Sequence, residues 1–142
     1  SNYISNQFII DDRVCLNGNK LMFIEPLEAN SNPAYVHATN GYLNYMLGRT
    51  SKKQVCNEIT SYILKIQNYL IWLYQSGSKY ETPFWEHARS LQFDDNLFNA
   101  LINICSSNSM ESVWSLMDEQ EVPEQYGQWD LSSIRNWIQN TK

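Results

Sequence analysis

The sequence predicts a mainly helical fold with a short extended or β arm at the N-terminus. After residue 30, apolar residues recur nearly everywhere at the three-and-four spacing of helices. Before residue 30, short apolar runs alternate with turn-forming residues, which is typical of short strands. Neither an internal repeat nor a shift in composition divides the chain. We therefore expect residues 1–142 to form a single helical domain or subdomain, with an extended arm over residues 1–30 and helices over residues 31–142.

The arm contains two apolar segments, residues 6–10 (NQFII) and 12–24 (DRVCLNGNKLMFI), which read as short strands around a turn. Asn17-Gly18-Asn19 supplies residues that tolerate positive φ. The chain begins at Ser1 without an initiator methionine, and its first twenty residues carry no helix signal. We expect either a processed protein or a piece of a longer one.

The first predicted helix runs from Pro33 to Gly48, because proline suits the first helical position and glycine often ends a helix. Apolar and neighbouring residues recur at helical spacing within it: Tyr35, Val36, Thr39, Tyr42, Leu43, Met46 and Leu47. Gly41 costs roughly 1 kcal/mol relative to alanine inside a helix. It is either a weak point or a position where another backbone or a ligand comes close.

Residues 51–77 give the clearest helical pattern. Ser51 and Gln54 form a capping box, and Gly77 ends the helix. An apolar stripe from Val55 to Leu73 fits either a coiled-coil seam or core packing. We favour core packing, because the pattern lasts only about three heptads and lacks regular opposite charges.

Four shorter helices are predicted beyond it: Pro83–Leu91, Asp94–Cys105, Ser109–Asp118 and Asp130–Asn140. An aspartate caps the second of these, and Pro123 with the polar residues 125–128 separates the last two.

Composition limits the possible partners. The chain has 142 residues, 43% hydrophobic and 13% aromatic, which is typical of a folded globular domain. A net charge of -5 with scattered basic residues argues against nucleic acid as a partner. No run of 18 apolar residues and no signal peptide is found, so we expect a cytoplasmic protein without a membrane partner.

Three cysteines, Cys15, Cys56 and Cys105, are far apart, and the two histidines, His37 and His87, are isolated from them. Their spacing fits neither a disulfide framework nor a metal site, so we predict reduced, buried thiols and no metal. The acidic pairs Asp11-Asp12, Asp94-Asp95 and Asp118-Glu119 are interpreted as caps or solvated groups.

Glu25 and Glu28 stand beside an apolar segment, just before the first predicted helix. A carboxylate there stabilises a helix N-terminus by a few tenths of a kcal/mol. Alternatively, a strand-to-helix junction with free backbone N–H groups is where proteins build anion sites and place an acid next to one.

Three segments resemble the flavin-dependent tryptophan halogenases. Residues 23–31 (FIEPLEANS) are similar to the family motif Phe-x-Glu-Pro-Leu-Glu-Ser-Thr-Gly, and residues 67–91 (QNYLIWLYQSGSKYETPFWEHARSL) to the stretch ending in Asp-Thr-Pro-Phe-Trp. Residues 112–126 (SVWSLMDEQEVPEQY) resemble a Ser-Trp…Gly-x-x-Pro…Tyr block near the end of many members. The blocks keep the family order and cover most of the chain.

The resemblance implies that the chain matches only the C-terminal third of such an enzyme. In the family, an N-terminal region binds FAD through a Gly-rich unit and supplies an essential lysine; neither has a match here. The expected partners are that FAD domain, a small aromatic substrate and chloride or bromide. We expect FAD in the full-length parent, and neither a cofactor nor halogenation for this chain alone.

Carried over by position, Glu28 matches the family's active-site glutamate. Asn30 and Ser31 fall where the family has threonine and glycine, whose backbone amides hold the halide beside flavin. Replacing that glycine limits how closely the backbone approaches its ligands. Ala29 also replaces a serine and removes its hydroxyl.

The resemblance implies less about the substrate and the residues of its pocket than about Glu28. Residues 101–114 (LINICSSNSMESVW) lack the aromatic and acidic cluster with which some members grip free tryptophan, so the implied substrate is another indole or aromatic. Trp85 and Trp114 either line this pocket or pack in the core. Trp72 and Tyr74 are expected to be exposed on the long helix, which would pack on the FAD domain.

Two hypotheses remain open. The chain is either the substrate-side part of a halogenase, or a stand-alone helical binding or interaction module that kept the fold without catalysis. A stand-alone module should hide its aromatic surface in a pocket or a homodimer, whereas a part of a larger enzyme should expose a broad apolar patch.

Overall fold

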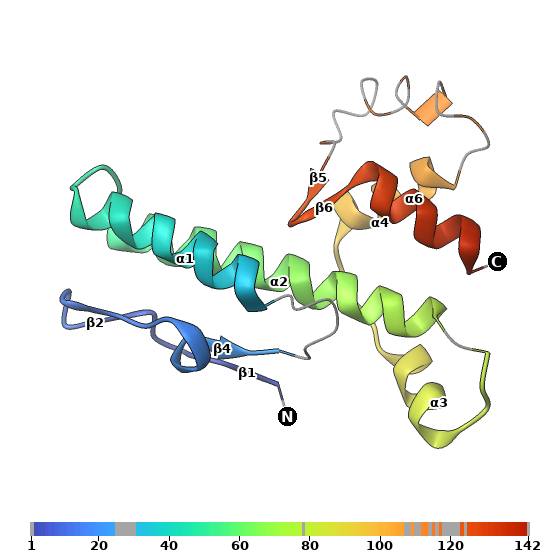
Figure 1. The fold of residues 1–142 in the computed structure, drawn as a ribbon, viewed down its shortest axis with the longest axis horizontal. Helices are drawn as coiled ribbons and strands as arrows, with labels where there is room; N and C mark the ends of the chain where they lie inside the picture. The colour runs from blue at the N-terminus through green and yellow to red at the C-terminus, as the bar shows by residue number, and fades with distance from the viewer. Residues whose placement is uncertain are drawn as a thin grey trace. The chain divides into compact units, whose positions relative to one another are not determined.

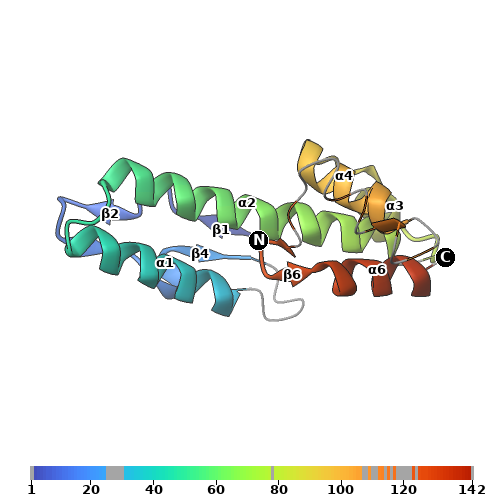
Figure 2. The same cartoon turned by 90° about the horizontal axis from the view of Figure 1, so that it is seen from above.

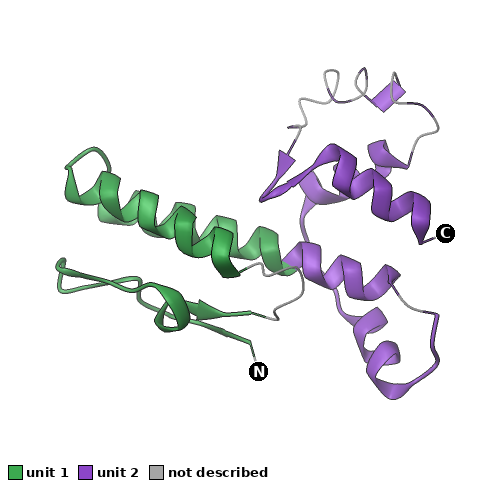
Figure 3. Cartoon of the chain, viewed as in Figure 1, with its two compact units in different colours: residues 1–67 green, residues 68–142 purple. Residues whose placement is uncertain are grey.

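The computed structural model describes residues 2–24, 31–77, 79–106, 109, 112–113, 115, 117, 123 and 125–141. They are mainly helical and begin with short antiparallel strands, which confirms the predicted fold class (Figure 1). The chain divides into two compact units, residues 1–67 and 68–142, and helix α2 contributes to both (Figure 3). The expectation of a single domain stays a prediction. No helix within the described residues is both long and apolar enough to cross a membrane.

The arm of unit 1 consists of short ladders rather than two continuous strands. Its elements are β1 (Tyr3–Ile4), β2 (Ile9–Ile10), β3 (Val14–Cys15), the 3-10 helix η1 (Gly18–Lys20) and β4 (Met22–Phe23). β1 pairs antiparallel with β4, and β2 pairs antiparallel with β3. The predicted strand over residues 12–24 is therefore interrupted by η1.

The β2–β3 turn is made by Asp11 and Asp12, whose φ angles are 48° and 56°. Aspartate is among the few residues that enter this left-handed region without a large cost. The interpretation of these two acids as caps or solvated groups missed this backbone role. Gly18, with φ of 56°, has the positive φ expected of the 17–19 segment, but it begins η1.

Helices α1 (Ser31–Met46) and α2 (Lys52–Ser76) lie side by side in unit 1 (Figure 2). Ala34 and Ala38 of α1 are buried. A Cβ on Gly41 would lie 3.5 Å from Val55 Cγ2 of α2, an ordinary contact distance to a side chain. Gly41 thus faces α2, but no backbone of the described residues outside α1 comes close to it, and its interpretation as a ligand position stays a prediction.

The apolar stripe read from the sequence of α1 does not mark its buried face. Tyr42 is buried, but Val36, Leu43, Met46 and the following Leu47 are all exposed, Met46 at 67%. Small residues are weak signals in a hydrophobic pattern, so the burial of Ala34 and Ala38 was missed.

The stripe on α2, in contrast, is buried within the chain, as core packing predicts. Ser51 Oγ accepts a hydrogen bond from the N–H of Gln54, which confirms one half of the capping box. The buried residues are Val55, Ile59, Ile63 and Ile66 in unit 1 and Tyr69, Leu70, Trp72 and Leu73 in unit 2.

Hydrogen bonds tie the arm to the helices of unit 1. Tyr42 Oη donates to the carbonyl of Leu16 at 2.7 Å, and Tyr35 Oη donates to that of Met22 at 3.0 Å. With Phe8, Ile9, Leu21, Met22 and Ile24 buried as well, the arm and the two helices share one core.

His37 of α1 stacks on Tyr62 of α2, with ring centroids 4.2 Å apart and the rings nearly parallel. Burial lowers the pKa of His37 below its ordinary value of 6.5; Lys65 adds to this shift and Glu58 opposes it. As the pH falls, His37 therefore takes up a proton in the unfolded chain before it does so in the folded chain. The folded state keeps its full stability above pH 6.5, and it loses stability as the pH falls from there through the lower folded-state pKa of His37.

We expect the free energy of unfolding to decrease between about pH 7 and pH 5, and to decrease less in His37→Phe, which keeps an aromatic ring but cannot titrate. Urea unfolding at a series of pH values measures this difference. His87→Phe, at an exposed histidine, is the matched control and should keep the wild-type pH dependence. Identical curves for wild type and His37→Phe would contradict the assignment.

Unit 2 is built on the last two turns or so of α2. Its further elements are α3 (Pro83–Ser90), α4 (Asn96–Cys105), β5 (Gln125–Tyr126), β6 (Trp129–Asp130) and α6 (Leu131–Asn140). α3, α4 and α6 match predicted helices to within two residues at each end. Of the predicted helix at 109–118, residues 112, 113, 115 and 117 are described as helical.

Trp72 lies in the core of unit 2, so the expectation that it is exposed was wrong. Its ring meets Phe98 edge-on at 5.5 Å and Trp137 at 6.4 Å. Packing of α4 and α6 residues against this end of α2 covers the ring. Tyr74, two residues later, is half-buried.

The short β5–β6 hairpin was not predicted. It pairs Tyr126 with Trp129 around Gly127, whose φ is 60°. Asp130 ends the hairpin and caps α6, accepting a 2.8 Å hydrogen bond from the N–H of Ser133. Asp95, rather than Asp94, caps α4 through the N–H of Phe98 at 3.0 Å.

Candidate functional site

The carboxylates that the sequence singles out fall between β4 and α1. β4 ends at Phe23, Ile24 is 1% exposed, and α1 begins at Ser31. The predicted strand-to-helix junction is therefore present. Glu28 and Asn30 themselves, together with the rest of 25–30, lie outside the described residues.

Both sides of this junction are fixed in the core of unit 1. Ile24 before it and Ala34 after it are buried, and the Tyr35 hydroxyl bonds the carbonyl of Met22 across it. The strand before the junction and the first turn of α1 are thus held together by direct contacts.

Ser31 is the first residue of α1 and is half-buried. The N–H groups of a helix's first turn have no partner within the helix, and Pro33 has no N–H at all. The backbone N–H of Ser31 is therefore chemically able to hold an anion, as the halide prediction for Asn30 and Ser31 requires. The role of Ser31 stays a prediction.

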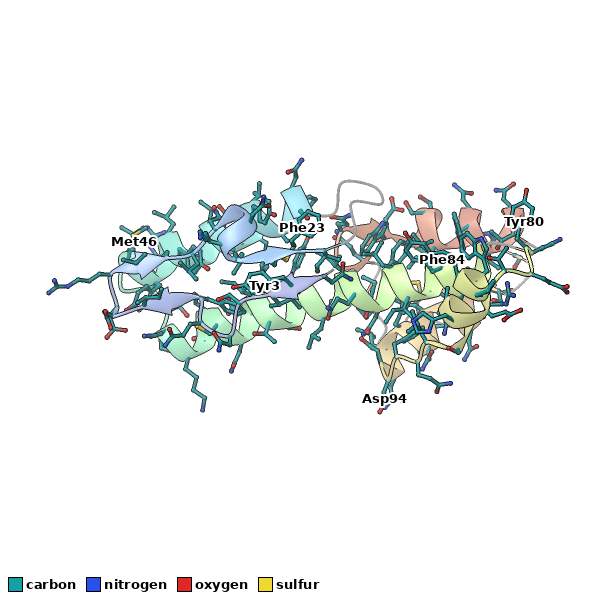
Figure 4. The ribbon with its side chains drawn as sticks, turned by 90° about the horizontal axis from the view of Figure 1, so that it is seen from below. Tyr3, Phe23, Met46, Tyr80, Phe84 and Asp94 are labelled. Carbon is teal, nitrogen blue, oxygen red and sulfur yellow. The ribbon has the colours of Figure 1, made fainter. Side chains whose placement is uncertain are left out.

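Trp85 lies in the first turn of α3 in unit 2, within a cluster of three rings. Its centroid is 5.0 Å from that of Phe84 and 6.0 Å from that of Tyr74. Trp85 is half-buried, and Phe84 is 58% exposed (Figure 4). The cluster is an open aromatic surface, which suits a pocket wall better than a closed core; the assignment as a pocket residue stays a prediction. Trp114 lies outside the described residues.

A polar network in unit 2 was not anticipated. The Tyr126 hydroxyl donates to Asp95 Oδ2 at 2.6 Å, and Asn68 Nδ2 lies 3.2 Å from both oxygens. Burial, followed by the hydrogen bond to Asp95, raises the pKa of Tyr126 well above its ordinary range. The network joins α2, the α4 cap and the β5–β6 hairpin, so its role is to position these elements.

The thiols differ in their surroundings. Burial raises the pKa of Cys105 to about 11, and its side chain is 2% exposed. Cys15 and Cys56 are half-buried, and their pKa values are also raised, mainly by burial. Cys105 is thus the reduced, buried thiol that was predicted, whereas the other two are only partly covered.

Unit 1 also contains a pocket of about 380 Å³ between the arm and α2. It is lined by residues 4–9 of the arm and by Lys52, Cys56 and Thr60, which follow one another at one-turn spacing. Among the described residues, no group of three His, Cys, Asp or Glu side chains is placed to hold a metal ion.

Comparison of the chain with models of protein families, with curated proteins and with solved structures finds no match.

Proposed function

We propose that this chain is the C-terminal, substrate-side part of a flavin-dependent halogenase of the tryptophan type. The observation that carries the proposal is the place of Glu25-Pro26-Leu27-Glu28 in the chain, between the buried Ile24 that follows β4 and the start of α1. The second motif, Thr82-Pro83-Phe84-Trp85, opens α3 and puts two aromatic rings in its first turn. The first motif thus precedes one helix in the chain and the second opens another.

The chain does not itself provide a flavin site. Its five glycines contain no Gly-x-Gly pair, and Gly41 and Gly77 are packed against Val55 and Trp137. FAD, which supplies the oxidised halogen when bound, belongs in this proposal to an N-terminal region of the parent. That region, a small aromatic substrate and chloride or bromide are the proposed partners.

Glu28 would act on the aromatic ring during halogenation. As the carbon–halogen bond forms, the ring becomes positively charged, and a fixed carboxylate stabilises that charge. The carbon–hydrogen bond then breaks, and the carboxylate accepts the proton while the electron pair restores the aromatic ring. Catalysis of this kind needs the carboxylate in a constant position. The described residues on either side of the segment, Ile24 and Ala34, are buried, which supports the proposal.

Exposed apolar side chains on both units support the proposal that this chain packs against another region of a larger protein. In unit 1, Tyr3 and Phe23 form an exposed cross-strand pair, and Met46 is exposed on α1 (Figure 4). In unit 2, Tyr80 is 74% exposed and Phe84 58%. Apolar side chains that lie together on a surface, as Tyr3 and Phe23 do, would be covered where the chain packs against another region.

We place the parent enzyme in the cytoplasm. The three cysteines of this chain are free, which fits a reducing compartment.

The test compares the isolated 142-residue chain with the full-length protein encoded by the whole reading frame. The full-length protein should bind FAD and halogenate small aromatics, detected by the chlorine isotope pattern of the product in mass spectrometry. The isolated chain should do neither, and titration with FAD should show no binding at micromolar concentrations. Tight FAD binding by the isolated chain, or a full-length protein that binds no flavin, would overturn the proposal.

A further inference from the structure

Unit 1 contains two half-buried free cysteines on elements that pack together. Cys15 lies on β3 in the arm, and Cys56 lies on the first turns of α2. Neither has a part in the proposed halogenation.

The strand register directs Cys15 toward the helices. Cys15 is the direct partner of Ile9 in the β2–β3 ladder, and side chains of directly paired residues point to the same face. Ile9 is 1% exposed, so this face is the one covered by the core. The carbonyl of the next residue, Leu16, accepts the hydrogen bond from the Tyr42 hydroxyl of α1, so this end of β3 lies against the helices.

The helix brings Cys56 to the same hairpin. Cys56 lines the pocket of unit 1 together with Phe8 and Ile9, the residues at the start of β2. One turn earlier, Lys52 forms a 2.7 Å ion pair with Asp12 of the β2–β3 turn. Cys15 follows Asp12 by three residues, and Cys56 follows Lys52 by one helical turn, about 5.4 Å of axial rise. Figure 2 shows β2 at the end of unit 1 where α1 ends and α2 begins.

The electrostatics of the two thiols agree with this placement. Burial is the largest cause of the raised pKa of Cys15, and the charge of the Cys56 thiolate is the second. Burial is also the largest cause of the raised pKa of Tyr42, and the charges of Cys15 and Cys56 add to it. These contributions agree with the placement that the strand register and the pocket lining give.

We propose that Cys15 and Cys56 form a reversible disulfide that fastens β3 to α2 when the chain meets a low-molecular-weight disulfide such as oxidised glutathione. The cross-link would join the arm to α2 around the intervening α1. It would also withdraw the Cys56 thiol from the wall of the pocket.

The reaction is a thiol–disulfide exchange in two steps. The Cys56 thiolate attacks one sulfur of oxidised glutathione, forms a mixed disulfide and releases one glutathione thiolate. Cys15 then loses its proton and attacks the Cys56 sulfur, which releases the second glutathione. Two protein thiols are oxidised and one glutathione disulfide is reduced to two thiols. Cys56 is the first nucleophile because Lys52 offsets part of the effect of burial on its pKa.

The test uses the folded 142-residue chain and oxidised glutathione at about pH 8, where a useful fraction of the thiols ionises. Free thiols are then alkylated, and the digested protein is mapped by mass spectrometry without reduction. We expect a Cys15–Cys56 linked peptide in the monomer, reversed by dithiothreitol. Cys105 should react only after denaturation. The oxidised form should unfold thermally at least about 5 °C above its reduced form.

Cys15→Ser and Cys56→Ser serve as matched controls, since each keeps one partner thiol. Each should stop at a mixed disulfide with glutathione on the remaining cysteine and lose the thermal shift. Glutathione adducts on both cysteines of the wild-type chain without a cross-link would overturn the proposal. Disulfide-linked dimers, or linkage through Cys105, as the main products would do so equally.

Discussion

Replacing Phe98 with alanine is expected to destabilise unit 2 by about 3–5 kcal/mol. Phe98 is 0% exposed and stands at the centre of the aromatic core. Its ring stacks on Tyr126 at 4.3 Å and contacts Tyr69 at 5.8 Å and Trp72 at 5.5 Å. Truncation removes these contacts and leaves a cavity among large, rigid rings, which cannot easily collapse to fill it.

Urea unfolding followed by tryptophan fluorescence measures this loss. Phe84→Ala is the matched control, because it makes the same change at an exposed phenylalanine of the same unit. We expect it to cost less than about 1 kcal/mol. If Phe98→Ala were no more destabilising than Phe84→Ala, the aromatic core described for unit 2 would be incorrect.

Glu28→Gln in the full-length enzyme is expected to reduce the rate of chlorination by about a hundredfold or more. Glutamine has nearly the same shape as glutamate, but it neither stabilises the charged ring nor accepts its proton. FAD binding should not change, because the proposed flavin site lies in another region of the parent. Steady-state turnover and FAD titration of the two proteins measure the two effects separately.

Glu25→Gln is the matched control for this prediction. It neutralises a carboxylate in the same Glu-Pro-Leu-Glu segment, three residues earlier. We expect Glu25→Gln to retain most of the activity. An equal loss in both variants would show that the segment's charge, rather than the Glu28 carboxylate, is responsible; unchanged turnover in Glu28→Gln would refute the assigned role.

The sequence predicted the helices well because their signals are local. Pro83 begins α3 and Asp130 caps α6. These end signals depend on neighbours within one turn, so the predicted and observed ends agree closely. The buried face of α1 could not be predicted in the same way, because two of its three buried residues are Ala34 and Ala38, which hydrophobic patterns score weakly.

The arm shows the limits of local reasoning more clearly. β1 pairs with β4, whose residues lie about twenty positions away in sequence, and two-residue strands carry almost no periodic signal. The Asp11-Asp12 turn and the β5–β6 hairpin around Gly127 contain turn-forming residues, which a search for hairpin signals could have found.

In the candidate site, too, features that depend on neighbouring residues were predicted, whereas features that depend on residues far apart in the chain were not. Glu28 and Trp85 were singled out because short stretches of sequence around them resemble family motifs. The Asp95–Tyr126 hydrogen bond and the placement of Cys15 beside Cys56 depend on residues far apart in the chain. Such pairs become visible only once the strands and helices are folded together.

The central claim, that this chain is the substrate-side part of a flavin-dependent halogenase, is tested most directly by reading the source DNA upstream of the Ser1 codon. Our account predicts an open reading frame that continues back to a strand followed by Gly-x-Gly-x-x-Gly, the loop that binds the flavin pyrophosphate. A stop codon close upstream, with a start codon just before Ser1, would contradict it. The chain would then function alone, as a helical binding or interaction module.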